Sequence, residues 1–167
     1  MSDVTIKSCS FTGHRQIVKE HSEILTDLTK SAIEYAYNNG CRKFYLGGAL
    51  GFDTLAAKEV LAFSDEHPDA ELHLLLPCHD QDAKWGDEDR EVYKQILKRA
   101  DSVEYVNNRY TPTCMKERNA ALVERADMLV AYMGRSYSGA GQTVRMAKEK
   151  GIPVYNLYPS CAEKCGG

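Results

Sequence analysis

The glycine-rich segment at residues 46–55, Leu-Gly-Gly-Ala-Leu-Gly-Phe-Asp-Thr-Leu, has the residue types and the spacing of a phosphate-binding turn. It follows a short β-rich run and leads into a helical pattern, so Gly47, Gly48 and Gly51 let the backbone approach a ligand at a helix start. Unpaired N–H groups and the helix dipole favour an anion there. The spacing is neither G-x-G-x-x-G nor a Walker A loop. The turn is a candidate phosphate site, and the alternative is a tight strand-to-helix turn whose glycines satisfy only backbone geometry.

Asp53 and Thr54 lie in the first turn of the helix that follows these glycines. A carboxylate at that position is favoured by the helix dipole and can cap free N–H groups. It can also accept a hydrogen bond from a ribose hydroxyl, and the threonine hydroxyl can contact a phosphate. We expect both side chains to be secondary ligand contacts.

Other residues suited to anion binding follow other predicted strands. Arg15 combines a permanently charged, planar fork with a nearby glycine, Gly13, that permits close approach; a surface salt bridge is its alternative role. Arg118 and Asn119 lie one turn into a later helix, and Ser-Gly-Ala-Gly-Gln-Thr at 138–143 is a second small-residue helix start. The candidate ligand-binding residues are Gly13, Arg15, Gly47, Gly48, Gly51, Asp53, Thr54, Arg118, Asn119, Gly139, Gly141 and Thr143, and no catalytic residue is assigned.

For several other side chains that are capable of chemistry, the argument for a functional role is weaker. Trp85 can stack on a base, but anchoring its long polar loop to the core is the favoured role. His14 has no fixed partner in the sequence, and the run His-Asp-Gln-Asp at 79–82 has no defined metal-ligand spacing. Cys161 and Cys165 form the only close cysteine pair, without a second pair or a histidine nearby. We therefore expect reduced thiols and no metal site.

Strand-like and helix-like patterns alternate along the whole chain and must position these residues. The expected strands are 6–11, 43–46, 72–76, 102–106, 128–133 and 153–157, and the expected helices are 22–39, 52–63, 87–100, 113–126 and 139–150. Such alternation predicts an α/β, Rossmann-like, doubly wound and mainly parallel sheet with helices on both faces. Ligands of such sheets bind beyond the carboxyl ends of the strands, where the strand order reverses. That rule selects the loops that hold the candidate residues.

Composition narrows the function classes. The chain of 167 residues is 43% hydrophobic and 27% charged, which predicts a single globular domain over 1–167, with 158–167 expected to form a flexible tail. A net charge of -3 provides no overall positive field to attract nucleic acid. The net charge does not exclude a local basic groove. No leader-like segment or long apolar run is evident. We expect a cytoplasmic protein without membrane contact.

The motifs, taken in order, resemble those of the YpsA-like branch of the SLOG superfamily, which also includes DprA and the Lonely Guy phosphoribohydrolases. The matching residues are Phe11 to Arg15, Gly47 to Thr54, Pro77, Trp85, Arg118, Asn119, Ala126, Asp127 and Ser138 to Thr143, and they cover nearly the whole chain. The resemblance implies a homo-oligomer whose ligand is a nucleotide or derivative such as AMP, ADP-ribose or NAD, with no other cofactor. The pocket carried over comprises Gly13, Arg15, Gly47, Gly48, Gly51, Asp53, Arg118, Asn119, Gly139 and Thr143.

One departure from the Lonely Guy enzymes bears on activity. Their signature P-G-G-x-G-T-x-x-E supplies a catalytic glutamate, but the corresponding position here is Met146 or Arg145. We therefore expect a domain that binds or senses a nucleotide-derived ligand. The first alternative is a nucleotide N-glycosidic hydrolase in which Asp53 or Asp80 replaces the glutamate. The second is DprA-like binding of single-stranded DNA, which the acidic balance of the chain disfavours.

Overall fold

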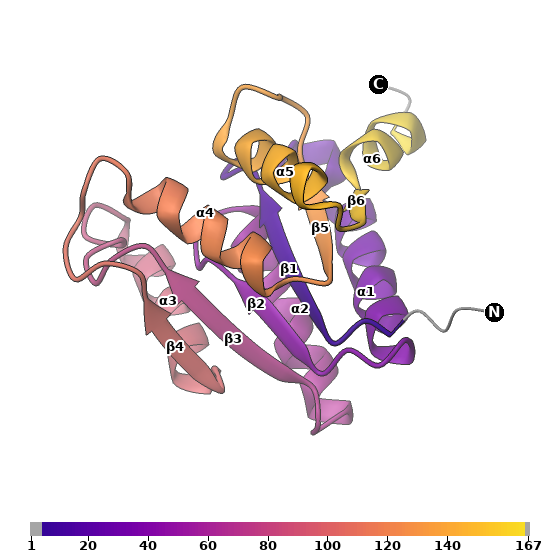
Figure 1. Cartoon of the computed structure of the whole chain (residues 1–167), viewed down its shortest axis with the longest axis horizontal. Helices are drawn as coiled ribbons and strands as arrows, with labels where there is room; N and C mark the ends of the chain where they lie inside the picture. The colour runs from indigo at the N-terminus through magenta and orange to yellow at the C-terminus, as the bar shows by residue number, and fades with distance from the viewer. Residues whose placement is uncertain (1–4, 166–167) are drawn as a thin grey trace.

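The protein, described by a computed structural model over residues 5–165, is built around one sheet of six strands (Figure 1). All neighbouring strands pair in parallel, in the order β4-β3-β2-β1-β5-β6. The chain starts in the middle, adds strands outward on one side, and then crosses back to place β5 beside β1. The strand order therefore reverses between β1 and β5. The strands are β1 (Ser8–Gly13), β2 (Lys43–Leu46), β3 (Glu71–Leu76), β4 (Ser102–Tyr105), β5 (Met128–Tyr132) and β6 (Val154–Asn156).

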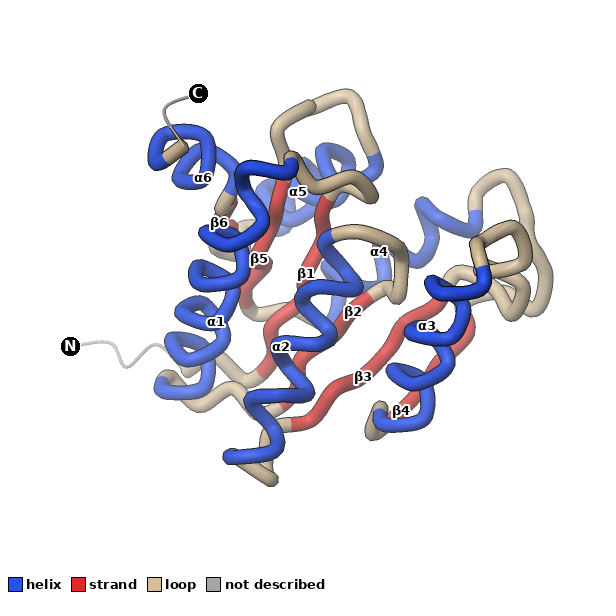
Figure 2. Tube along the Cα trace, turned by 180° about the vertical axis from the view of Figure 1, so that it is seen from behind, coloured by secondary structure: helices blue, strands red, loops and turns tan. Residues whose placement is uncertain are grey.

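Helices cover both faces of the sheet. Helices α1, α2 and α3 pack behind the sheet in the view of Figure 1 and in front of it in Figure 2, while α4 and α5 cover the opposite face. Their bounds are α1 (Ser22–Asn38), α2 (Phe52–Glu66), α3 (Asp87–Arg99), α4 (Cys114–Arg125), α5 (Gly139–Lys150) and α6 (Tyr158–Lys164), with a short 3-10 turn η1 at Lys19–His21. This arrangement confirms the predicted α/β, Rossmann-like class.

The central strands are buried on both faces, which explains their continuous apolar sequences. In β5, all residues from Met128 to Tyr132 are buried. Val130 and Tyr132 belong to the large core under α1 and α2, whereas Leu129 and Ala131 pack with residues of α4 and α5. Alternate side chains of one strand thus supply two cores.

Strand β1 begins two residues later than the predicted segment 6–11. Its serines are buried, and each hydroxyl donates to a backbone carbonyl near the end of α4: Ser10 Oγ to Leu122 O at 2.7 Å, and Ser8 Oγ to Arg125 O. The Asp127 carboxylate accepts hydrogen bonds from the backbone N–H groups at the strand start. Polar residues are tolerated in this central strand because each is hydrogen-bonded.

Within the segment 158–167, which was expected to be a flexible tail, Tyr158–Lys164 form α6, and residues 166–167 lie outside the described residues. This helix lies next to α1, and its Cys161 side chain is fully buried in the main core. Cys165 is partly buried, with Sγ 3.0 Å from the Glu20 carbonyl oxygen. All six cysteines are free, as predicted. None of the helices within residues 5–165 has the length and apolar character needed to cross a membrane.

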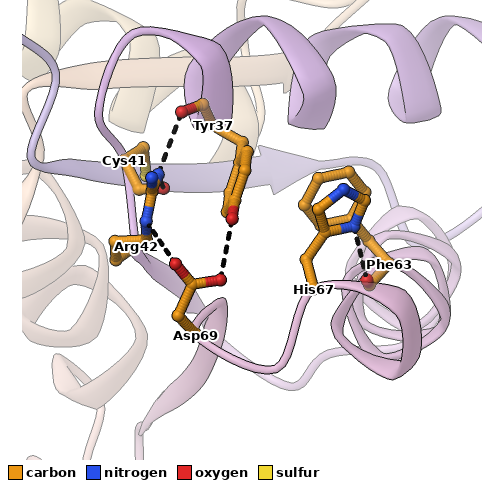
Figure 3. Close-up of polar contacts among 6 residues, drawn as sticks. All are labelled: Tyr37, Cys41, Arg42, Phe63, His67 and Asp69. Atoms are coloured by element: carbon orange, nitrogen blue, oxygen red, sulfur yellow. Dashed lines mark hydrogen bonds and ion pairs between the residues drawn. The ribbon is translucent and has the colours of Figure 1, made fainter.

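At the amino edge of the sheet, side chains of neighbouring loops bind one another (Figure 3). Asp69 accepts hydrogen bonds from Tyr37 Oη at 2.8 Å and Arg42 Nε at 2.9 Å, and the guanidinium lies 3.8 Å from the centroid of the Tyr37 ring. The ring of His67 stacks on Phe63, with ring centroids 4.0 Å apart. These contacts join the loops before β2 and β3. The open site lies at the other edge of the sheet.

Candidate functional site

A cleft of about 460 Å³ lies at the carboxyl edge of the sheet, where strand order reverses between β1 and β5. This volume is in the range of small-ligand sites. Its walls come from the loop after β1, the β2–α2 turn, α4 and the loop between β5 and α5. The lining residues are 12–16, Ala49, Asp53, Met115, Arg118, Asn119, Leu122, Arg135 and 137–140.

Arg118 brings a buried positive charge into the wall of this cleft. Its side chain projects from α4, the residue is only 7% exposed, and burial lowers the pKa of the guanidinium. Nη1 donates to Gly47 O at 2.7 Å and Nε donates to Asn119 Oδ1 at 2.9 Å. Within residues 5–165, no carboxylate oxygen lies within 4.0 Å of it. A buried guanidinium without a direct ion-pair partner is costly, so the site favours an anion close to it.

Asp53 is the single carboxylate among the described residues that line the cleft. It is 4% exposed; Oδ2 accepts a hydrogen bond from Ala49 N at 3.1 Å, while Oδ1 has no partner in the described part of the chain. Burial raises the pKa of this carboxyl to about 6, against the opposing effects of the Arg118 and Arg15 charges. An unpartnered buried oxygen is unusual in a folded protein and marks this wall as a place for a ligand donor.

The start of α5 presents backbone donors to the cleft. Ser138 caps the helix: its Oγ accepts a hydrogen bond from Gly141 N at 3.0 Å. The N–H groups of Gly139 and Ala140 precede the intrahelical ladder and have no acceptor in the helix. A Cβ on Gly139 would have Asn119 Nδ2, at 3.9 Å, as its nearest neighbour, and its φ is not positive. The fold therefore does not require glycine at this position, and the backbone there is open to close approach.

The glycines of the β2–α2 turn have a different role. A Cβ on Gly47 would overlap the Arg118 guanidinium, and one on Gly48 (φ +71) would lie 2.6 Å from Leu76 Cδ2. A Cβ on Gly51 (φ +78) would overlap the Arg15 carbonyl group. None of these glycines is among the residues that line the cleft. Backbone geometry and close packing therefore account for them, and from this turn the cleft receives Ala49 and Asp53.

At the N-terminus of α2, protein groups already occupy positions that a phosphate would need. Phe52 N donates to His14 O at 3.1 Å, and the Thr54 hydroxyl donates to Ala49 O at 2.9 Å. At the other helix start, Thr143 is fully buried and its hydroxyl donates to Gly139 O. The predicted residues that the structure brings together in the cleft are Gly13, Arg15, Asp53, Arg118, Asn119 and Gly139; Gly47, Gly48, Gly51, Thr54, Gly141 and Thr143 lie outside its lining.

Arg135 and Tyr137 are among the cleft residues that were not predicted as site residues. Both lie in the loop after β5, which the carboxyl-end rule selects, so their position was the available signal. His14, a weak candidate, holds this loop: its Nε2 accepts hydrogen bonds from Gly134 N at 2.8 Å and Arg135 N at 3.3 Å. Burial and the Arg135 charge lower the pKa of His14. Trp85 packs edge-on to Tyr93 against the core, outside the cleft.

Comparison with known families identifies the family of this chain. A model described as the YspA SLOG family (YpsA) matches residues 11–152, a range that contains every residue of the cleft. The chain belongs to the YpsA SLOG family. This YpsA-family protein is 29% identical to a UPF0398 protein of Bacillus pumilus (strain SAFR-032) over 86% of this chain and 72% of the relative. It is 32% identical to a UPF0398 protein of Bacillus cereus (strain B4264), over 72% and 67% of the two chains.

The YpsA-family chain also shares its fold with solved structures of DNA processing protein A (DprA). The Helicobacter pylori protein, described for its single-stranded DNA binding mode, superposes with a TM-score of 0.66 at 19% identity over 96% of this chain and 73% of that one. The Streptococcus pneumoniae protein gives a TM-score of 0.66 at 15% identity, over 96% and 54%. At these identities the likeness shows a common fold.

Proposed function

We propose that this YpsA-family protein binds a phosphate-bearing, nucleotide-derived ligand, of the AMP, ADP-ribose or NAD type, in the cleft between the ends of β1 and β5. The observation that carries the proposal is the Arg118 guanidinium, buried in the cleft wall without a carboxylate within 4.0 Å in the described part of the chain. A ligand phosphate would supply the missing negative charge.

The other walls suit the same ligand. The N–H groups of Gly139 and Ala140 point outward from the start of α5, where the helix dipole favours a phosphate. Arg15 and Arg135 are exposed residues at the rim of the cleft, so they add positive charge without blocking it. In the same lining, Asp53 offers an acceptor for a ligand hydroxyl or amine. Among its described residues, the site combines several anion-binding groups with a single carboxylate.

Gly139→Ala tests the phosphate contact without disturbing the fold. The added methyl group meets only ordinary packing distances, and alanine is the better helix former. We expect AMP, ADP-ribose or NAD to raise the melting temperature of the parent protein, and adenosine to raise it much less. In Gly139→Ala the shift caused by the nucleotide should be largely lost, because the methyl group holds the phosphate away from the N–H groups.

Gly86→Ala is the matched control for this experiment. Gly86 precedes α3, a Cβ there meets nothing within 4 Å, and the residue lies outside the cleft lining. This variant should keep the full nucleotide shift. Equal shifts from AMP and adenosine, or an unchanged nucleotide shift in Gly139→Ala, would remove the basis of the proposal.

A nucleotide N-glycosidic hydrolase is the second candidate, and the observation in its favour is Asp53. This carboxyl lines the cleft with a pKa near 6, a value suited to acid–base chemistry. The residues at the position of the Lonely Guy glutamate cannot act here: Met146 packs against the second core, and Arg145 donates to Ser136 O at 2.7 Å. Chromatography of AMP incubated with the parent and with Asp53→Asn separates the two functions. Free base released only by the parent would place hydrolysis first.

A further inference from the structure

Tyr137 lies at the rim of the cleft with its side chain in solvent. It is 97% exposed, far more than Tyr110 at 63%, the next most exposed large hydrophobic residue in the described part of the chain. An exposed aromatic ring contributes nothing to the core, and it offers a flat apolar face to a partner. The fold therefore gives no reason for an aromatic residue at this position.

The loop that carries Tyr137 is nevertheless held in place on both sides of it. On one side, Arg135 N donates to His14 Nε2 at 3.3 Å, and Arg135 O accepts from Ser138 Oγ at 2.6 Å. Next to Tyr137, Ser136 O accepts a hydrogen bond from Arg145 Nη1 at 2.7 Å. The exposed ring is thus presented by an ordered backbone, so less entropy is lost when a ligand meets it.

The position of Tyr137 relative to the anion site matches the shape of a nucleotide. Only Ser138 separates it from Gly139, so their Cα atoms are at most about 7 Å apart. A phosphate on the N–H groups of Gly139 and Ala140 would therefore leave the base of the same nucleotide within reach of the Tyr137 ring. Trp85, the residue that the sequence offered for stacking, packs against the core instead.

We infer that Tyr137 is the specificity-determining residue of the cleft, stacking on the planar base of a bound nucleotide while the phosphate occupies the start of α5. The inference rests on the proposed function, since it requires a phosphate-bearing ligand in this cleft. It predicts that the protein distinguishes a nucleotide from a sugar phosphate by the base, and that this distinction depends on one exposed ring.

The test compares AMP and ADP-ribose with ribose 5-phosphate by isothermal titration calorimetry on the whole chain. The parent should bind the adenine-containing ligands more tightly than ribose 5-phosphate. Tyr137→Ala should weaken AMP and ADP-ribose binding by about tenfold, in line with base–aromatic stacking, and leave ribose 5-phosphate unchanged. Tyr137→Phe keeps the ring and should retain the affinity. Tyr110→Ala, the matched control, removes an exposed tyrosine that does not line the cleft and should change nothing.

The outcomes separate the inference from the function on which it rests. If AMP and ADP-ribose bind the parent but Tyr137→Ala binds them equally well, the stacking role is wrong and phosphate recognition stands. Equal losses for ribose 5-phosphate and AMP in Tyr137→Ala would also overturn it, because the ring would then serve the loop rather than the base. If no phosphorylated ligand binds the parent, the proposed function and the inference both fall.

Discussion

At the scale of single residues, the cleft contains two buried charges that are not joined in an ion pair. Arg118 and Asp53 both lie in its wall, but no guanidinium nitrogen lies within 4.0 Å of a carboxylate oxygen of Asp53, although the charges act on each other's pKa. Burying charges without a direct pair lowers stability, a cost that folded proteins accept mainly at functional sites. The raised pKa of Asp53 gives this cost a pH dependence.

We expect Asp53→Asn to stabilise the protein at neutral pH. The folded-state pKa is about 6, above the ordinary 3.8, so the folded protein binds a proton that the unfolded chain releases between these values. Stability from this group is therefore present at low pH and is lost as pH rises through about 6. The gain in Asp53→Asn should approach zero near about pH 4 and reach up to about 3 kcal/mol at about pH 7.5; the attraction to Arg118 is already included in the folded-state pKa.

Urea denaturation across this pH range measures the effect. Asp27→Asn, on the exposed surface of α1, is the control and should show no comparable pH-dependent gain. A constant difference between Asp53→Asn and the parent from pH 4 to pH 7.5 would show that the Asp53 carboxyl ionises like an exposed one.

At the scale of elements, the two glycine-rich helix starts differ in their surroundings. The start of α2 is filled by the loop after β1, whose carbonyl oxygens approach Gly51 and Phe52 closely. The start of α5 opens into the cleft, and Gly139 there has space for a methyl group. Similar local sequences therefore pack closely at one helix start and leave an open backbone at the other.

Gly51→Ala should destabilise the fold by at least about 2 kcal/mol, because it places a side chain at positive φ and against the backbone of Arg15. Gly139→Ala should stay within about 0.5 kcal/mol of the parent or stabilise it slightly. Urea denaturation of the pair measures both values. A stable Gly51→Ala protein would show that the first loop can move away from α2, and would reopen that helix start as an anion site.

At the scale of the whole molecule, the cleft and the chain carry opposite charge balances. The chain has a net charge of -3, whereas the cleft lining holds Arg15, Arg118 and Arg135 against Asp53 alone. A local positive site on an acidic protein suits a small anion better than a long polyanion. Tyr137 is exposed at the cleft and offers a ring to any base, so single-stranded DNA is a competing ligand that must be tested.

We expect a single-stranded oligonucleotide to bind weakly at low salt and to be released as salt approaches the physiological range. Few phosphates can be neutralised at once, because the basic surface is confined to the cleft. Fluorescence anisotropy at about 50 mM and about 200 mM salt measures the effect. A tight complex at the higher salt would place DNA binding ahead of small-ligand recognition.

The sequence alone determined the architecture, because local periodicity and turn residues encode it. Alternating apolar runs and amphipathic helices gave six strands and the five main helices with boundaries that differ by at most three residues. The rule for parallel sheets then selected the loops and helix starts that line the cleft, which hold Arg15, Arg118 and Gly139. These features depend on neighbours close in the chain.

Tertiary structure alone decided which residues line the cleft. A glycine has the same local signature whether a ligand or a packed side chain requires it, so the roles of Gly48 and Gly139 separated only when Leu76 and the open cleft were in place. Likewise, burial of Arg118 and exposure of Tyr137 depend on contacts between elements far apart in the chain. Long-range packing determines exposure and charge pairing, and these in turn determine what the site can bind.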